Sequence, residues 1–140
     1  MKRGNTRRDR GSAMLESVLS LIALLTALIG ILDLGQFLFM HQMITERVRA
    51  AASYGSRSPY DPAAIQNVVL FGTATPAVGQ TPMFNLPAST VAVSRRDAGT
   101  TEDRIVVSVT GYPITFLTPG IAGVATGIPI RVTATYDGGL

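Results

Sequence analysis

The chain of 140 residues contains no cysteine and no tryptophan, and its single histidine is His41. The absence of cysteine excludes disulfides and Cys-based metal sites, although it does not identify the compartment. Charged residues make up only 15% of the sequence, whereas hydrophobic residues make up 46%. We find no nucleophile paired with a base, no metal-ligand cluster and no phosphate-binding glycine loop. The sequence therefore predicts no enzyme activity, no cofactor and no metal site.

Positive charge is concentrated at the N-terminus. Before Gly11 the chain carries one acid, Asp9, and five basic residues, namely Lys2, Arg3, Arg7, Arg8 and Arg10. From Ser12 onward acidic residues slightly outnumber basic ones, so the net charge of +3 belongs to this short head. Binding of nucleic acid needs basic residues spread over a folded face. We therefore expect no nucleic-acid partner.

A long apolar run follows the basic head. Residues 17–32 contain no charged side chain. A helix over residues 13–40 would be about 42 Å long at roughly 1.5 Å per residue, and a bilayer core needs only about 20 residues. The sequence therefore predicts one span of the lipid bilayer, with the basic head in the cytoplasm and the C-terminal part outside.

Helical spacing continues beyond the apolar run. In the stretch HQMITERVRAAASY the apolar residues recur every three or four positions, which is typical of a helix with one buried face. Gly55 followed by Pro59 is a stop signal. We therefore predict one helix from Ser12 to Tyr54, and we expect His41 to be a surface residue without a partner.

Small and polar residues line one side of this predicted helix. At about 100° per residue, an arc of roughly 80° contains Ser12, Glu16, Ser20, Ala23, Ala27 and Gly30, which we call the small-residue stripe. Small side chains let a second helix approach closely. The stripe is therefore a candidate assembly face, although Ala and Ser are common enough for such a pattern to arise by chance.

Asp33 is a second acid on the helix. It lies 17 residues beyond Glu16, or roughly 26 Å along a helix, so the two acids would lie near opposite surfaces of the bilayer. One interpretation is an interfacial residue that stays hydrated, because buried charges in membranes cost free energy. The other is a contact with a neighbouring helix.

The order of a basic head, a glycine, four residues, a glutamate and a hydrophobic helix, seen in RGSAMLES and the run after it, resembles the class III signal of type IV pilin-like proteins. The resemblance implies cleavage by a prepilin peptidase, a membrane aspartyl peptidase, between Gly11 and Ser12. Glu16 is then the fifth residue of the mature chain, where that family keeps its acid.

Residues 7–56 look like the TadE-like pilus-assembly family of the tight-adherence secretion system. The resemblance includes the acid before glycine at Asp33-Leu34-Gly35 and the extension rich in Ala and Arg. A weaker echo continues in SVTGYPITFLTPG and IPIRVTATYD, and Ser17 stands where the family often has an aromatic residue. The resemblance implies a minor pilin or pseudopilin of the bacterial inner membrane, whose partners are other pilin-like subunits and the inner-membrane pilus assembly machinery.

The position of Glu16 has a physical explanation if the chain is cleaved in this way. The helix macrodipole favours a carboxylate near a helix N-terminus by roughly 0.3–1 kcal/mol, which is less than the several kcal/mol that a charge in lipid costs. The N-terminal amine created by cleavage, from the same chain or a neighbour, would offset that cost. We therefore interpret Glu16 as a charge that docks one subunit on another.

The remaining residues predict a small outer domain. Asp61 and Gly72 bound a helix over residues 62–71, and alternation of apolar residues predicts strands at 90–95, 104–111 and 128–136. The loop between the first two strands carries Asp97, Glu102 and Asp103, which we expect to form a solvated turn rather than a calcium site. The predicted fold is α+β and pilin-like, with a three-stranded antiparallel sheet on the outer half of the long helix. The predicted divisions are a leader (1–11), the helix (12–56) and the outer domain (57–140).

The connection over residues 113–127 is long and apolar. Its large side chains include Phe116, Leu117 and Ile121. One interpretation is that it packs on the helix or seals the sheet. The other is an interface with the membrane surface or a partner subunit, since long loops are often functional.

Four other interpretations of the chain remain open. The N-terminus could be an ordinary secretory signal or a twin-arginine signal. The helix could be an uncleaved single-pass anchor that carries a periplasmic binding domain. A general secretion pseudopilin is the fourth, and it would differ only in its partners.

Overall fold

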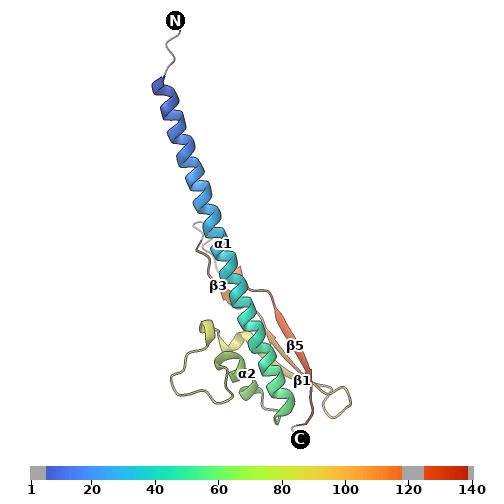
Figure 1. Ribbon diagram of the computed structural model, residues 1–140. Helices are drawn as coiled ribbons and strands as arrows, with labels where there is room; N and C mark the ends of the chain where they lie inside the picture. The colour runs from blue at the N-terminus through green and yellow to red at the C-terminus, as the bar shows by residue number, and fades with distance from the viewer. Residues whose placement is uncertain (1–5, 118–124, 139–140) are drawn as a thin grey trace.

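The computed structural model describes residues 6–117 and 125–138, which form a long helix and a small α+β domain packed on its second half (Figure 1). This confirms the predicted pilin-like fold class. The helices are α1 (Thr6–Arg57) and α2 (Pro62–Phe71), with 3-10 turns at Met83–Asn85 and Ala88–Thr90. The strands are β1 (Val91–Arg96), β2 (Arg104–Val109), β3 (Pro113–Ile114), β4 (Ala125–Thr126) and β5 (Ile130–Thr135).

Helix α1 is longer than predicted at both ends. It begins at Thr6 rather than Ser12 and ends at Arg57 rather than Tyr54. Gly55 does not stop the helix. A Cβ atom there would lie 2.7 Å from Ile65 Cδ1 and 3.1 Å from Ile105 Cδ1. The missing side chain therefore serves close packing of α2 and the sheet against α1, and this packing overrides the local stop signal.

Helix α2 has the bounds that its capping residues predict. The Asp61 carboxylate accepts hydrogen bonds from the backbone N–H of Ala63 at 2.9 Å and of Ala64 at 3.2 Å. Gly72 ends the helix in the left-handed conformation, with φ of 79°. Both signals act within a few residues of chain, which is why the sequence was sufficient to place this helix.

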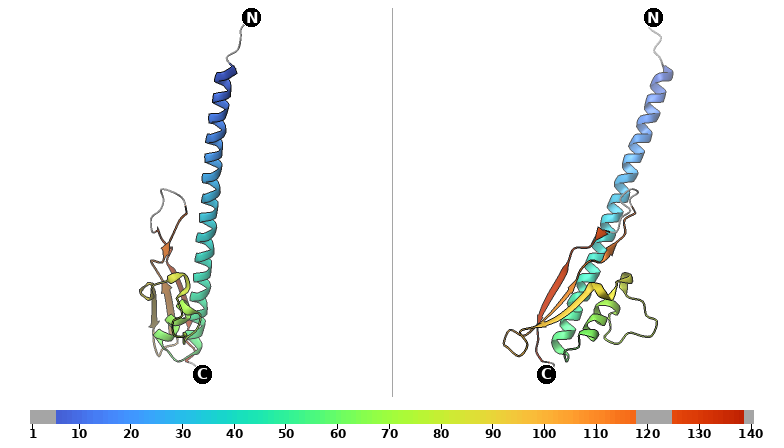
Figure 2. Two further views of the ribbon diagram at one scale, coloured as in Figure 1. Left: turned by 90° about the vertical axis from the view of Figure 1, so that its left-hand side faces the viewer. Right: turned by 180° about the vertical axis from the view of Figure 1, so that it is seen from behind.

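Strands β1, β2 and β5 form the predicted three-stranded antiparallel sheet in the order β1-β2-β5. The helices lie on one side of it (Figure 2). On that side the side chains of Ile105, Val107 and Val109 are fully buried. The alternation in the sequence therefore identified the inner face of β2 correctly.

The core is completed by one face of α1 and one face of α2. Ile44, Val48 and Ala51 of α1 are fully buried, as are Ile65 and Val69 of α2. Their spacing of three or four residues places them on single helix faces. The second half of α1 therefore provides the surface on which the domain packs.

The turn between β1 and β2 is held by charge pairs. The Asp103 carboxylate accepts hydrogen bonds from Arg95 Nε at 2.9 Å and from the Gly99 N–H at 3.0 Å. The Arg95 guanidinium lowers the pKa of Asp103 to about 2 through this hydrogen bond and lies 4.1 Å from the centre of the Tyr136 ring. The predicted solvated turn is therefore wrong for Asp103, which is buried, whereas Glu102 is exposed.

Candidate functional site: the bare half of the long helix

Among the described residues, almost nothing packs against residues 11–32 of α1. In residues 11–32 every side chain is exposed except the half-buried Ile29, and the exposed side chains include Leu19 at 66% and Ile31 at 67%. This stretch is about 33 Å long at roughly 1.5 Å per residue, against about 30 Å for a hydrocarbon core. The helix is long and apolar enough to cross a membrane.

The predicted processing and assembly residues lie on this bare segment, except Asp33, which is buried at its end. Gly11 is inside α1, and no atom outside its local backbone lies within 4 Å of where its Cβ would be. The segment is one uninterrupted helix, so the predicted arc of the small-residue stripe is retained. Among the described residues, Glu16 makes no hydrogen bond or ion pair, and its side chain is exposed. The stripe is therefore accessible to another molecule.

Asp33 marks the end of the bare segment. It is only 6% exposed, and its Oδ1 atom accepts a hydrogen bond from the backbone N–H of Leu117 at 2.6 Å. Neither interpretation from the sequence included this contact within the chain. The bond joins residues 84 positions apart, so no local pattern could reveal it.

The segment that reaches Asp33 is an arm, which we define as the described residues 112–117 and 125–128. Its strands β3 and β4 form a two-stranded antiparallel pair that the sequence did not predict, and it lies along α1 (Figures 1 and 2). Phe116 packs against the core, which agrees with the packing interpretation. Leu117 is 58% exposed, and its contact with a membrane or partner stays a prediction. Ile121 lies outside the described residues.

Tyr112 anchors the base of the arm to α1. Its ring is fully buried, its hydroxyl lies 2.7 Å from His41 Nδ1, and its carbonyl accepts a hydrogen bond from the Gly127 N–H at 3.0 Å. Burial raises the pKa of the Tyr112 hydroxyl. The expectation that His41 has no partner is therefore wrong, because a residue 71 positions away bonds to it.

The small-residue stripe and the face of α1 on which the domain packs lie in line along the helix. Counting about 100° per residue from Ser12, Ala23 and Gly30 fall within about 20° of His41 and Val48, which contact the domain. The domain therefore stands above the same side of the helix that the stripe occupies. A helix that packed on the stripe would meet the arm at its outer end.

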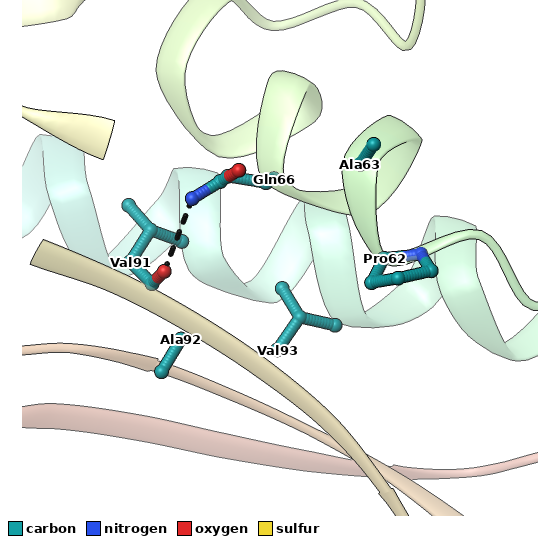
Figure 3. A pocket seen from close by; sticks show the side chains of 6 residues that line it. All are labelled: Pro62, Ala63, Gln66, Val91, Ala92 and Val93. Atoms are coloured by element: carbon teal, nitrogen blue, oxygen red, sulfur yellow. Dashed lines mark hydrogen bonds between the residues drawn. The ribbon is translucent and has the colours of Figure 1, made fainter. Parts of the chain in front are cut away.

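The outer domain also has a hollow of about 470 Å³ between α2 and β1 (Figure 3). It is lined by Pro62, Ala63, Gln66, Val91, Ala92 and Val93. Gln66 Nε2 donates a hydrogen bond to the Val91 carbonyl at 3.2 Å across it. The lining carries no titratable side chain, so this hollow offers no acid–base chemistry. Within the described part of the chain, no group of three His, Asp or Glu side chains is placed to hold a metal ion.

Residues 11–53 match the family model described as TadE-like protein. This segment of the chain is therefore similar to the TadE-like protein family. No curated protein and no solved structure matches the chain significantly. The TadE-like segment starts at Gly11 and ends at Ser53, so it covers the bare half of α1 and most of the face on which the domain packs. The similarity to this family therefore rests on residues of the long helix α1.

Proposed function

We propose that this TadE-like protein is a pilin-like structural protein in the assembly of a tight-adherence pilus, as a minor pilin or pseudopilin, and that it is not an enzyme. One observation carries the proposal. The TadE-like helix is bare and apolar over residues 11–32, whereas beyond Asp33 one face of it becomes covered by its own domain and side chains such as Leu38 and Phe39 stay exposed. An apolar helix of that length is stable only in lipid or against other helices.

Processing at Gly11 fits the local structure of the helix. A glycine inside a helix is about 1 kcal/mol less favourable than alanine, so the helix unwinds most easily there into the extended form that a protease binds. Cleavage by a prepilin peptidase would leave a new amine at Ser12. Glu16 lies one helical turn away, about 6 Å along the axis, and can pair with this amine or with that of a neighbouring subunit.

The orientation follows from the basic head. Positive residues before the span stay in the cytoplasm, so the domain lies on the outer side of the bacterial inner membrane. Partner pilin-like subunits then pack on the small-residue stripe inside the bilayer. A general secretion pseudopilin would use the same geometry with other partners.

An uncleaved anchor with a periplasmic binding domain is the second candidate. The observation in its favour is that α1 runs from Thr6 through Gly11 without a break. An intact helix resists proteolysis because a protease needs extended backbone. The state of the N-terminus therefore decides between the two.

The test is the intact mass and N-terminal sequence of the full chain, extracted from membranes that contain an active prepilin peptidase. We expect a chain that begins at Ser12. Gly11→Val should keep the leader, because a β-branched side chain restricts the backbone at the cleavage site, whereas Gly4→Val is the control and should still be processed. A chain that begins at Met1 in the presence of the active peptidase contradicts processing and favours the anchor.

A further inference from the structure

The face of the sheet that points away from the helices carries three arginines on three neighbouring strands. They are Arg96 on β1, Arg104 on β2 and Arg131 on β5, and we call them the arginine cluster. The register places Arg96 directly opposite Arg104, and Ser108 opposite Arg131. All three arginine side chains are exposed. They alternate along the strands with the inward residues of the core, so they share the outer face.

A hollow of about 160 Å³ lies within the cluster. Its lining consists of Arg96, Arg104, Val106, Arg131 and Thr133. Val106 is on the outer face and yet only 8% exposed, which is expected where the aliphatic parts of arginine side chains cover an apolar residue. The hollow is therefore a small apolar floor with guanidinium groups and one hydroxyl around it, and its volume suits a carboxylate or a phosphate group.

The charges of the cluster are only partly balanced. Arg104 Nη2 lies 2.8 Å from Asp97 Oδ2, and both side chains are 45% exposed. In residues 11–117 and 126–138, neither Arg96 nor Arg131 has an acid within ion-pair distance. Glu102 lines a neighbouring hollow with Arg104, and Asp103 is engaged with Arg95 on the helix side. Like charges directly opposite each other destabilise a sheet. Repulsion between Arg96 and Arg104 therefore destabilises the sheet, and a bound anion would reduce this repulsion.

We infer that the arginine cluster binds a carboxylate group of a partner protein. Arginine is suited to this because its planar fork can make two parallel hydrogen bonds to one carboxylate. The partner's chemistry is an acidic side chain or an acidic segment that reaches the outer face of the sheet. In the part of the chain that the structure describes, no helix lies on that face (Figure 2), so a partner can approach it directly.

A lipid headgroup is a poorer candidate, because the cluster is far from the proposed membrane. The Asp137 N–H donates a hydrogen bond to the Ser56 carbonyl at 3.0 Å, so β5 ends beside the outer end of α1. Ser56 lies about 35 Å along the helix from Asp33, and Arg131 lies about 13 Å back along β5 from Thr135. The cluster is thus roughly 20–35 Å from the end of the bare segment, beyond a Debye length of about 8 Å. The exclusion of lipid depends on the proposed orientation in the membrane. The geometry of the cluster is independent of that orientation.

The test uses the full chain in nanodiscs of uncharged lipid and a fluorescein-labelled hexaglutamate peptide, with binding followed by fluorescence polarisation. We expect the double variant R96Q/R131Q to bind the peptide at least about tenfold more weakly than the parent, since it loses charge-assisted hydrogen bonds. The control R49Q/R57Q removes the same charge from exposed positions on α1 and should bind within about twofold of the parent. The unfolding temperature of R96Q/R131Q should not fall, because a like-charge pair is removed.

Three results would overturn the inference. They are a parent chain that does not bind the peptide, equal losses in the double variant and its control, and competition by inorganic phosphate or a short DNA duplex at the concentrations at which free hexaglutamate competes. If the double variant unfolds, the single variant R131Q is tested instead, because Arg131 lies opposite Ser108 rather than another arginine. Weaker binding of the peptide by R131Q supports the inference, and unchanged binding refutes it. Cleavage after Gly11 does not depend on this face, so failure here is distinguishable from failure of the proposed function.

Discussion

Replacing Gly127 with alanine is expected to destabilise the folded domain by about 3 kcal/mol and to release the arm from α1. A Cβ atom at Gly127 would lie 1.9 Å from Tyr112 Cζ and 2.0 Å from its Cε2. The ring has no room to move, because it is fully buried and its hydroxyl lies 2.7 Å from His41 Nδ1. Either the ring or the strand must shift, and both belong to the arm's attachment.

The measurement is the unfolding midpoint of the full chain in nanodiscs, together with hydrogen exchange of residues 112–117. Thr126→Ala is the matched control, because Thr126 is the exposed neighbour of Gly127 and its loss should change little. Tyr112→Phe should cost only about 1 kcal/mol, since it removes one hydrogen bond and keeps the ring. A Gly127→Ala variant as stable as Thr126→Ala would show that the arm is not held by this contact.

Replacing Glu16 with glutamine is expected to abolish stable association with pilin-like partner subunits. The substitution keeps the size of the side chain and removes the charge that pairs with an N-terminal amine. Loss of one member of a desolvated ion pair costs about 3–5 kcal/mol, so the affinity for the partner should fall by roughly a hundredfold to several thousandfold. The measurement is the amount of partner that co-purifies with the tagged chain from membranes.

Two controls make the Glu16 result specific. Glu46→Gln removes an acid that lies outside the bare segment, where it pairs with Arg49 on the helix surface, and should leave co-purification unchanged. The intact mass of the Glu16→Gln variant should still correspond to a chain that begins at Ser12, which separates docking from processing. Full recovery of the partner with a processed Glu16→Gln chain would remove the docking role of this acid.

Those parts of the fold whose signals lie close together in the chain could be predicted. Helix α2 follows from Asp61 and Gly72, which act on their immediate neighbours. The three long strands follow from alternation, because Ile105, Val107 and Val109 must share one buried face. The bare half of α1 could be predicted from composition alone, because lipid is the only solvent that suits so many apolar side chains.

The features that were missed depend on long-range contacts or on packing. Asp33 bonds to Leu117, and His41 to Tyr112, across 84 and 71 residues. Gly55 resembles a helix stop signal in its local sequence. Only the close approach of Ile65 shows that the glycine is needed for packing. Strands β3 and β4 have two residues each, which is too short for alternation to be recognised. The small-residue stripe depends on a partner helix, so its role stays a prediction.

The proposed assembly depends most on which side of the bare helix meets another protein. The chain is well suited to a direct measurement because it has no cysteine of its own. Single cysteines at Ala23 and Ala27 on the stripe, and at Ile22 and Leu25 on the opposite side, can each carry a benzophenone photo-crosslinker in assembling membranes. We predict that the two stripe positions form crosslinks to protein and the two opposite positions form them mainly to lipid. Crosslinks to protein that are as abundant from positions 22 and 25 as from positions 23 and 27 would contradict the account.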